Sequence, residues 1–163
     1  AATQLTQAHR ALRLGRPEAV WATLHQLWSH QASPGLYTWD APRPTQDEVA
    51  DGWQYARGWH NETAVSPDYE TAALLLLLQQ DMLAYLDEAA AEPTVVLGAG
   101  ITPAWLSQPM AVSNLALPGG SITWQWDGQK MRVTLRGPVR KIQLGSAFPP
   151  GTELAVVQKP LRP

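Results

Sequence analysis

The longest apolar pattern in the chain lies at residues 66–86, SPDYETAALLLLLQQDMLAYL. Ser66 is a good helix cap, Pro67 suits the first turn, and acidic side chains follow where the positive end of the helix dipole favours them. The five leucines at 74–78 span more than one turn at about 3.6 residues per turn, so this turn has no polar face. The pattern predicts a central core helix that other elements cover on all sides.

Shorter helical patterns precede this core helix. Leucine and alanine recur at helical spacing in residues 3–14, a glycine stop follows, and residues 17–31 carry a second apolar stripe. These two stretches predict a helical hairpin with a very short link. Thr45 and Glu48 form a capping box that opens a further helix over residues 46–57.

The pattern changes after a hinge of small residues at 88–92, from helical spacing to short alternating apolar runs. Asp127-Gly128 is a strong two-residue hairpin signal between two runs whose apolar residues alternate cleanly. A helical turn is expected at 103–106. The expected strands are 95–97, 110–117, 121–126, 130–136, 139–144 and 153–157.

The two patterns divide the chain into two predicted domains. Residues 1–92 are expected to hold about four helices in two hairpins, and residues 93–163 an antiparallel β-domain. The predicted fold class is therefore α+β. The central helix is too short and too polar at its ends to span a bilayer, which needs about 20 apolar residues, and no signal peptide or membrane partner is expected.

Composition and charge narrow the chemistry. The chain has no cysteine, which excludes disulfides, thiolate zinc sites and a cysteine nucleophile. Its four histidines have no spacing typical of a metal site, so neither a metal nor a cofactor is expected. The net charge of −2 gives no indication of nucleic-acid binding. Residues 1–94 carry 5 basic and 12 acidic side chains, and residues 95–163 carry 7 and 2, which favours docking of two oppositely charged halves.

Tryptophan is unusually abundant, with eight residues against a single phenylalanine. Tryptophans in excess of what a core needs point to carbohydrate or partner contact, because a flat indole stacks on a ligand and still satisfies its one N–H group. The alternative is a core that is simply rich in tryptophan. The sequence leaves both interpretations open.

Three stretches, taken in order, carry a resemblance to a known family. They are VSPDYETAALLLLLQQDML at 65–83, VLGAGITPAWL at 96–106 and MAVSNLALPGG at 110–120. They resemble the C-terminal ends of (α/α)-barrel glycoside hydrolases, in which the last helical hairpins run directly into a small β-domain. A complete barrel needs many more helices than this chain supplies, so the resemblance implies a terminal fragment of such an enzyme. The chain departs from the family at 67–69, where Pro-Asp-Tyr stands in place of His-Gly-Trp.

The resemblance implies where a catalytic carboxylate would lie. Barrel families of this kind typically invert the sugar, which needs an acid and a base ~6.5–9.5 Å apart, on loops at one rim. The acidic candidates are Asp40, Glu62, Asp68 and Glu70. Glu62, beside His60 in a long loop, is the strongest of them, with a solvated loop glutamate as the alternative. Asp68 and Glu70 fit better as carboxylates at a helix start.

The same loops are rich in aromatic side chains that suit sugar binding. Trp39 and Trp59 are the expected stacking platforms, together with Tyr37. Asp40 and His60 would supply hydrogen bonds to hydroxyl groups. These five residues form the predicted substrate-binding set.

The sequence thus predicts the C-terminal part of a carbohydrate-active, glycoside hydrolase-like protein, which contributes glycan-site loops and a barrel-sealing β-domain. Its expected partners are a carbohydrate and the rest of the barrel, on another segment or chain, with a homo-oligomer as a further possibility. Because a fragment would lack the second carboxylate, the chain is expected to be inactive alone. The alternative is a non-catalytic interaction or scaffold domain that shares the end of this architecture.

Overall fold

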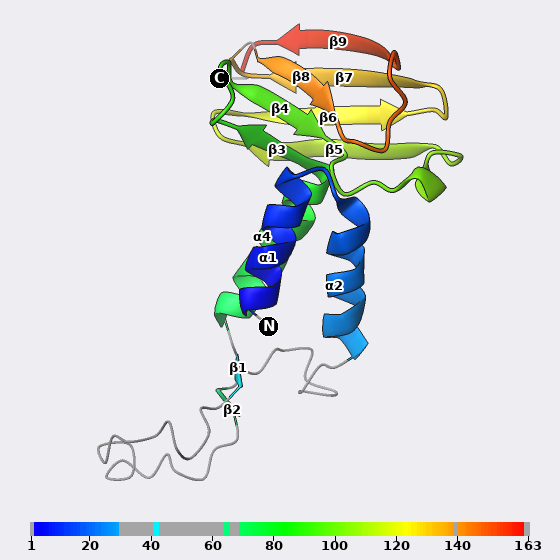
Figure 1. The fold of residues 1–163 in the computed structure, drawn as a ribbon. Helices are drawn as coiled ribbons and strands as arrows, with labels where there is room; N and C mark the ends of the chain where they lie inside the picture. The colour runs from blue at the N-terminus through cyan, green and yellow to red at the C-terminus, as the bar shows by residue number, and fades with distance from the viewer. Residues whose placement is uncertain (1, 30–40, 43–63, 66–68, 139, 162–163) are drawn as a thin grey trace.

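A computed structural model describes residues 2–29, 41–42, 64–65, 69–138 and 140–161. Within these residues the fold is mixed α+β, as predicted, and contains no closed barrel (Figure 1). Its helices are α1 (Ala2–Arg13), α2 (Pro17–Ser29), α4 (Tyr69–Leu83) and a short 3₁₀ helix, η2 (Pro103–Trp105). The helix predicted at 46–57 lies outside the described residues. None of the described helices is both long and apolar enough to cross a membrane.

The described strands form three sheets, with orders β1-β2, β3-β4-β8 and β5-β6-β7-β9. Most of the expected strands of the second half are present at nearly their predicted bounds. The strands are β1 (Ala41–Pro42), β2 (Ala64–Val65), β3 (Ala84–Asp87), β4 (Thr94–Leu97), β5 (Met110–Leu117), β6 (Gly120–Trp126), β7 (Lys130–Arg136), β8 (Lys141–Leu144) and β9 (Glu153–Lys159).

The prediction of a purely antiparallel β-domain was wrong. The β3–β4, β5–β6 and β6–β7 pairs are antiparallel, whereas β4 pairs with β8 and β7 pairs with β9 in parallel. Both parallel pairs join strands that are not consecutive, since β5, β6 and β7 separate β4 from β8, and β8 separates β7 from β9. Local alternation identifies a strand but carries no information about such a crossover partner.

The predicted core helix also ends earlier than expected. Helix α4 stops at Leu83, and residues 84–86 belong to strand β3, which pairs with β4 and buries Ala84 and Tyr85. The N–H groups of Gly98 and Gly100 donate to the carbonyl oxygens of Leu83 and Met82, at 2.8 and 2.9 Å. Tertiary pairing therefore replaces the last helical turn that the apolar pattern indicated.

Strand β4 lies between two apolar clusters. All four of its residues are buried, and Val95 and Leu97 face the sheet β5-β6-β7-β9, whereas Val96 packs on the helices. The alternation of side chains along a strand sends successive residues to opposite faces. The helices, the sheet β3-β4-β8 and the sheet β5-β6-β7-β9 therefore form three layers, with β3-β4-β8 in the middle.

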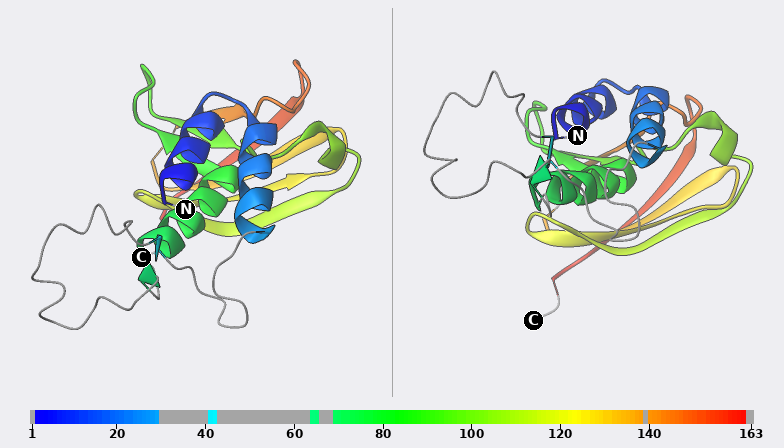
Figure 2. Two further views of the ribbon diagram at one scale, coloured as in Figure 1. Left: turned by 60° about the horizontal axis from the view of Figure 1, so that its bottom comes forward. Right: turned by 90° about the horizontal axis from the view of Figure 1, so that it is seen from below.

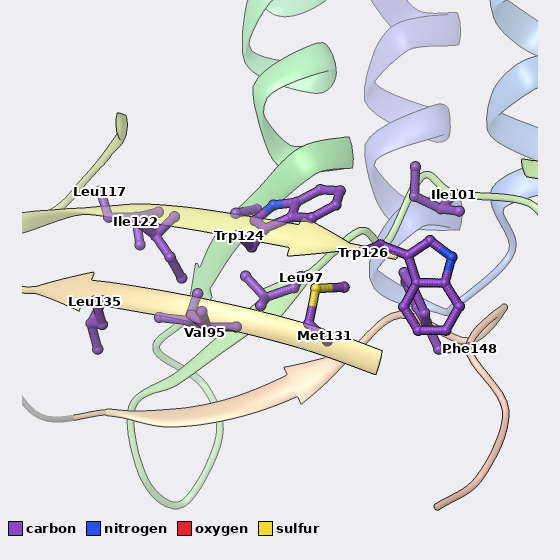
Figure 3. Close-up of a cluster of buried hydrophobic side chains, with 12 residues drawn as sticks. Val95, Leu97, Ile101, Leu117, Ile122, Trp124, Trp126, Met131, Leu135 and Phe148 are labelled. Carbon is purple, nitrogen blue, oxygen red and sulfur yellow. The ribbon is translucent and has the colours of Figure 1, made fainter. Parts of the chain in front are cut away.

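The cluster between the sheets is closed by the β6–β7 hairpin (Figure 3). Ile122, Trp124 and Trp126 of β6 lie opposite Leu135, Val133 and Met131 of β7, and all six are at most 4% exposed. The predicted hairpin and its inward faces are confirmed. Trp124 is a core tryptophan whose Nε1 donates to the Leu83 carbonyl at 3.1 Å.

The helices point away from the sheets, with the α1–α2 link and the end of α4 at the sheets (Figure 1). Helix α1 packs against both α2 and α4 (Figure 2). Leu78 is 0% exposed, but Leu76 and Leu77 in the same run are 68% and 55% exposed. Among the described residues, α4 is therefore covered on one side only, whereas the apolar pattern predicted cover on all sides.

Apolar packing and neutral hydrogen bonds, not opposite charge, join the helices to the sheets. Trp21 donates to the Gly100 carbonyl at 2.8 Å, and Ser146 donates to the Gly15 carbonyl at 2.9 Å. Among the described residues, each ion pair lies within one half of the chain, at Asp81 or at Asp127. The predicted docking of oppositely charged halves has no such pair to support it.

Candidate functional site

The residues predicted to bind and cleave sugar lie outside the part of the chain that the structure describes. Their predicted roles stay predictions. The set comprises the catalytic candidate Glu62 and the binding residues Tyr37, Trp39, Asp40, Trp59 and His60. Of the helix-start acids, Asp68 also lies outside this part, and Glu70 is an exposed residue in the first turn of α4.

The two segments that carry these candidates are connected through a short strand pair. β1 and β2 are antiparallel, with Ala41 opposite Val65 and Pro42 opposite Ala64. In sequence, β1 directly follows the first candidate segment and β2 begins shortly after the second. Residues 41–42 and 64–65 therefore lie side by side.

The described residues contain a different aromatic cluster, which sequence analysis did not single out as a site. Trp21, His25 and Trp28 recur along one side of α2, and Trp105 of η2 packs against Trp21. The ring centroids of Trp21 lie 5.4 Å from Trp105, 6.1 Å from His25 and 6.4 Å from Trp28. Trp28 and Trp105 are 42% and 44% exposed, so this cluster presents indole surface to solvent.

The turn after β4 fixes the position of this cluster. Gly98 has a φ of 63°, a left-handed conformation that favours glycine, and Gly100 lies so close to the Met82 side chain that a Cβ would collide with it. The carbonyl oxygen of Gly100 accepts the Trp21 Nε1 hydrogen bond, which holds that ring in place. Gly98 therefore permits the turn, and Gly100 permits close packing on Met82 beside the carbonyl that binds Trp21.

Two hollows flank Trp21 and Trp105. The first, here called the helix groove, has a volume of about 190 Å³. Its walls are almost entirely apolar, and they are Trp21, Leu24, Trp28, Gln79, Met82, Leu83, Gly100, Ile101 and Trp105. The second, here called the indole pocket, is a broader depression of about 650 Å³. Its walls are Glu18, Trp21, Ala22, His25, Thr102, Pro103, Ala104 and Trp105.

The indole pocket combines aromatic surface with three polar side chains. Glu18 and His25 come from α2, one turn before and one turn after Trp21. Thr102 precedes η2, and its hydroxyl makes no capping hydrogen bond to that helix. Glu18 is the one carboxylate among the described residues that line the pocket, so these residues do not assemble the acid–base pair that sugar hydrolysis needs. Its geometry suits binding.

A group of polar side chains, away from the indole pocket, connects α1 to α4. Asp81 accepts a hydrogen bond from Arg13 at 3.1 Å and lies 3.6 Å from His9 Nδ1. The Arg13 guanidinium stacks 3.7 Å from the Tyr85 ring centroid. Burial raises the pKa of the Tyr85 hydroxyl above its ordinary value, and the nearby Arg13 charge acts in the opposite direction. These contacts hold α1 against α4 and β3. Arg13 and Tyr85 also line a hollow of about 270 Å³ beside the α1–α2 link.

The described residues contain no group of three or more histidines and acids that could hold a metal ion. No protein-family model matches the chain, and no curated protein or solved structure does.

The sequence contained a signal for this aromatic cluster, which the apolar helical pattern of α2 concealed. Trp21 and Trp28 are seven residues apart, and Trp21 lies just beside the buried stripe of α2. Trp105 follows the proline of a short turn. Trp21 and Trp105 are brought together by the hydrogen bond between Trp21 and Gly100, which lie 79 residues apart. No local spacing in the sequence indicates such a contact.

Proposed function

We propose that this chain is the C-terminal part of a carbohydrate-active protein with the architecture of an (α/α)-barrel glycoside hydrolase. In this role its helices belong to hairpins of a helical toroid, its β-domain seals one end of the barrel, and its loops contribute to a glycan site. The rest of the barrel belongs to another segment or chain. Alone, the chain is catalytically inactive.

The observation that carries this proposal is the uncovered face of α4. Leu76 and Leu77 are mostly exposed, although they belong to the same run as the fully buried Leu78. Full burial of a leucine side chain contributes about 1.5–3 kcal/mol. Two adjacent leucines in water therefore favour a further element against this helix, and a neighbouring helix of a toroid would provide one.

The order of the elements gives further support. The three stretches that resemble the family lie on α4, on the β4–η2 segment and on β5. Helix α4 runs directly into the β-sheets, with no intervening domain. This order matches the junction of last helix and β-domain that the resemblance implies.

Glu62 is the proposed catalytic carboxylate. The proposed binding residues are Tyr37, Trp39, Asp40, Trp59 and His60. An inverting mechanism needs a second carboxylate ~6.5–9.5 Å from the first, on the other face of the sugar. This second carboxylate is assigned to the rest of the barrel, which explains the expected inactivity of the isolated chain.

The proposal is tested first by the solution mass of the 163-residue chain, measured by light scattering over a range of concentrations. An uncovered apolar face is expected to cause self-association. The double variant Leu76→Lys and Leu77→Lys is expected to be monomeric, and Leu14→Lys, at another exposed leucine, serves as the control that leaves association unchanged. A wild-type chain that is monomeric throughout would contradict the proposal.

Catalysis is tested in a longer protein that contains the chain. Hydrolysis of a glycosidic bond is expected there, and Glu62→Gln should abolish it while leaving the melting temperature unchanged. If Glu62→Gln keeps full activity, the assignment of this carboxylate is wrong, although the chain can still be part of the barrel.

The alternative is a non-catalytic interaction or scaffold domain. It is favoured by the two apolar clusters that the chain buries by itself, one between the sheets and one between the helices and β4. A monomeric chain that unfolds cooperatively and gives no hydrolysis in any longer protein would support this alternative.

A further inference from the structure

We propose that the indole pocket is a binding site for a neutral saccharide, separate from the loop residues proposed above. This inference does not rest on the barrel. It rests on the exposed Trp105 ring, on the fixed Trp21 ring beside it, and on the polar side chains that surround them.

The aromatic platform is preorganised. The Trp21 ring is held by its hydrogen bond to Gly100, and Trp105 packs on it with a ring angle of 39° and a centroid distance of 5.4 Å. The segment after η2 is also fixed, because Trp126 Nε1 donates to the Leu106 carbonyl at 2.9 Å. A rigid indole with nearly half of its surface in water loses little entropy when a ligand stacks on it.

The polar side chains match the hydroxyl groups of a sugar. Within the described residues, Glu18 has no ion-pair partner and the Thr102 hydroxyl makes no capping bond, so both have unused hydrogen-bonding capacity. His25 also lines the pocket, with its ring centroid 6.1 Å from that of Trp21. A concave site with aromatic walls and a few convergent polar groups is the usual form of a small-molecule site.

The charge of the pocket separates a sugar from other aromatic-stacking ligands. Among the described residues, no lysine or arginine lines it, and Glu18 is the one Asp or Glu in its walls. A nucleotide or another phosphate-bearing ligand would find no cation there, although phosphate binding depends on such contacts. An apolar peptide side chain is better matched by the helix groove, whose walls carry a single polar side chain, Gln79. A neutral sugar fits the indole pocket best.

The test is calorimetric titration of the folded chain with cellohexaose, xylohexaose and maltohexaose, together with the indole N–H signals in two-dimensional nuclear magnetic resonance spectra. At least one oligosaccharide is expected to bind and to shift the Trp105 and Trp21 signals. Trp105→Ala should weaken binding by roughly tenfold or more, since the stacking platform is lost. Because Trp105 is partly exposed, this variant is expected to fold, which a melting curve checks.

The matched control is Trp28→Ala. Trp28 is as exposed as Trp105 and also contacts Trp21, but it lines the helix groove and not the indole pocket. This variant should keep affinity within about threefold. Thr102→Val, which keeps side-chain volume and removes the hydroxyl, should weaken binding severalfold.

Two results would overturn the inference. One is the absence of binding by all three oligosaccharides at millimolar concentration. The other is binding that survives Trp105→Ala and is lost in Trp59→Ala, which would assign the sugar to the predicted loops instead. Neither result depends on the solution mass of the chain, so this inference and the barrel proposal fail separately.

Discussion

The β6–β7 hairpin and helix α4 bury their apolar side chains in different ways. In the hairpin, every inward-facing residue from Ile122 to Leu135 is at most 4% exposed, and outward positions such as Arg132 are polar. In α4, one leucine is fully buried while two of its neighbours in the same run are mostly in water. The hairpin belongs to a layer that is complete within this chain. Helix α4 carries more apolar surface than the described elements cover.

The difference teaches that apolar content and burial are separate quantities. A strand pattern of period two matches a sheet with one buried face, so the polar positions mark solvent. The leucine run of α4 contains no polar residue, so its sequence does not show which face contacts solvent. The exposed leucines are informative because large contiguous apolar surfaces are uncommon on monomers. Substitutions in the two regions should therefore change the free energy of unfolding by different amounts.

The largest effect is expected at Trp124, in the closed layer. Trp124→Ala removes a side chain that is 1% exposed and leaves the Leu83 carbonyl without its Nε1 donor. The expected loss is about 3–5 kcal/mol in the free energy of unfolding, measured by chemical denaturation. Trp105→Ala is the control, because a partly exposed indole should lose far less. Equal losses in the two variants would mean that the layer is not closed.

The next effect compares neighbouring leucines of α4. Leu78→Ala should cost about 2–5 kcal/mol, because Leu78 is fully buried among α1 and α4 residues. Leu76→Ala, two residues earlier, should change the free energy of unfolding by at most about 0.5 kcal/mol in the monomeric chain. The two values come from the same denaturation experiment. A large loss in Leu76→Ala would show that this face is covered in solution.

A smaller effect is expected at Gly100, in the turn after β4 that packs on the end of α4. Gly100→Ala places a methyl group against the Met82 side chain and disturbs the carbonyl that accepts the Trp21 hydrogen bond. Overpacking of this kind typically costs about 1–3 kcal/mol. Ala104→Gly changes one methyl group in the same segment at an exposed position and should have a much smaller effect. An unchanged free energy of unfolding in Gly100→Ala would indicate that the backbone and Met82 adjust freely to the added methyl group.

Much of this fold was predictable from local pattern, and the rest depended on contacts across the chain. The bounds of α1 and α2, the centre of α4 and the β6–β7 hairpin follow from helical spacing, alternation and turn residues. Strand β3 was missed because its residues continue the apolar helix pattern, and only pairing with β4 converts them to strand. The parallel partners of β4 and β7 were missed because crossovers have no local signature.

The candidate site divides in the same way. The loop residues around Glu62 were chosen from residue type and stay a prediction. The indole pocket was missed because its walls come from α2 and η2, which are far apart in sequence. Their tryptophans are brought together by the turn that follows the β3–β4 pair. Trp28 lies four residues after Leu24, in register with the buried stripe of α2, yet it is 42% exposed. Helical spacing alone does not distinguish the buried residues of this stripe, such as Leu24, from the exposed Trp28 beside them.

The smallest effect is expected at the tip of the β6–β7 hairpin, where the closed layer meets solvent. Asp127 Oδ1 accepts hydrogen bonds from the N–H groups of Lys130 and Gln129 at 2.9 and 3.0 Å, and these bonds lower the pKa of Asp127 below its ordinary value of 3.8. Because the folded-state pKa is lowered, the stabilisation is present above about pH 4 and is lost as the pH falls through the folded-state pKa.

Asp127→Asn keeps an oxygen acceptor but removes the charge, whereas Asp127→Ala removes both. The wild type should therefore be slightly more stable than Asp127→Asn at pH 6, and the difference should become smaller as the pH falls towards about 2. Asp127→Ala should remain less stable than Asp127→Asn at both pH values, because the turn N–H groups lose their acceptor. Thermal unfolding of the three proteins at the two pH values measures these differences. If the wild type and Asp127→Asn differ equally at both pH values, the charge has no role in this turn.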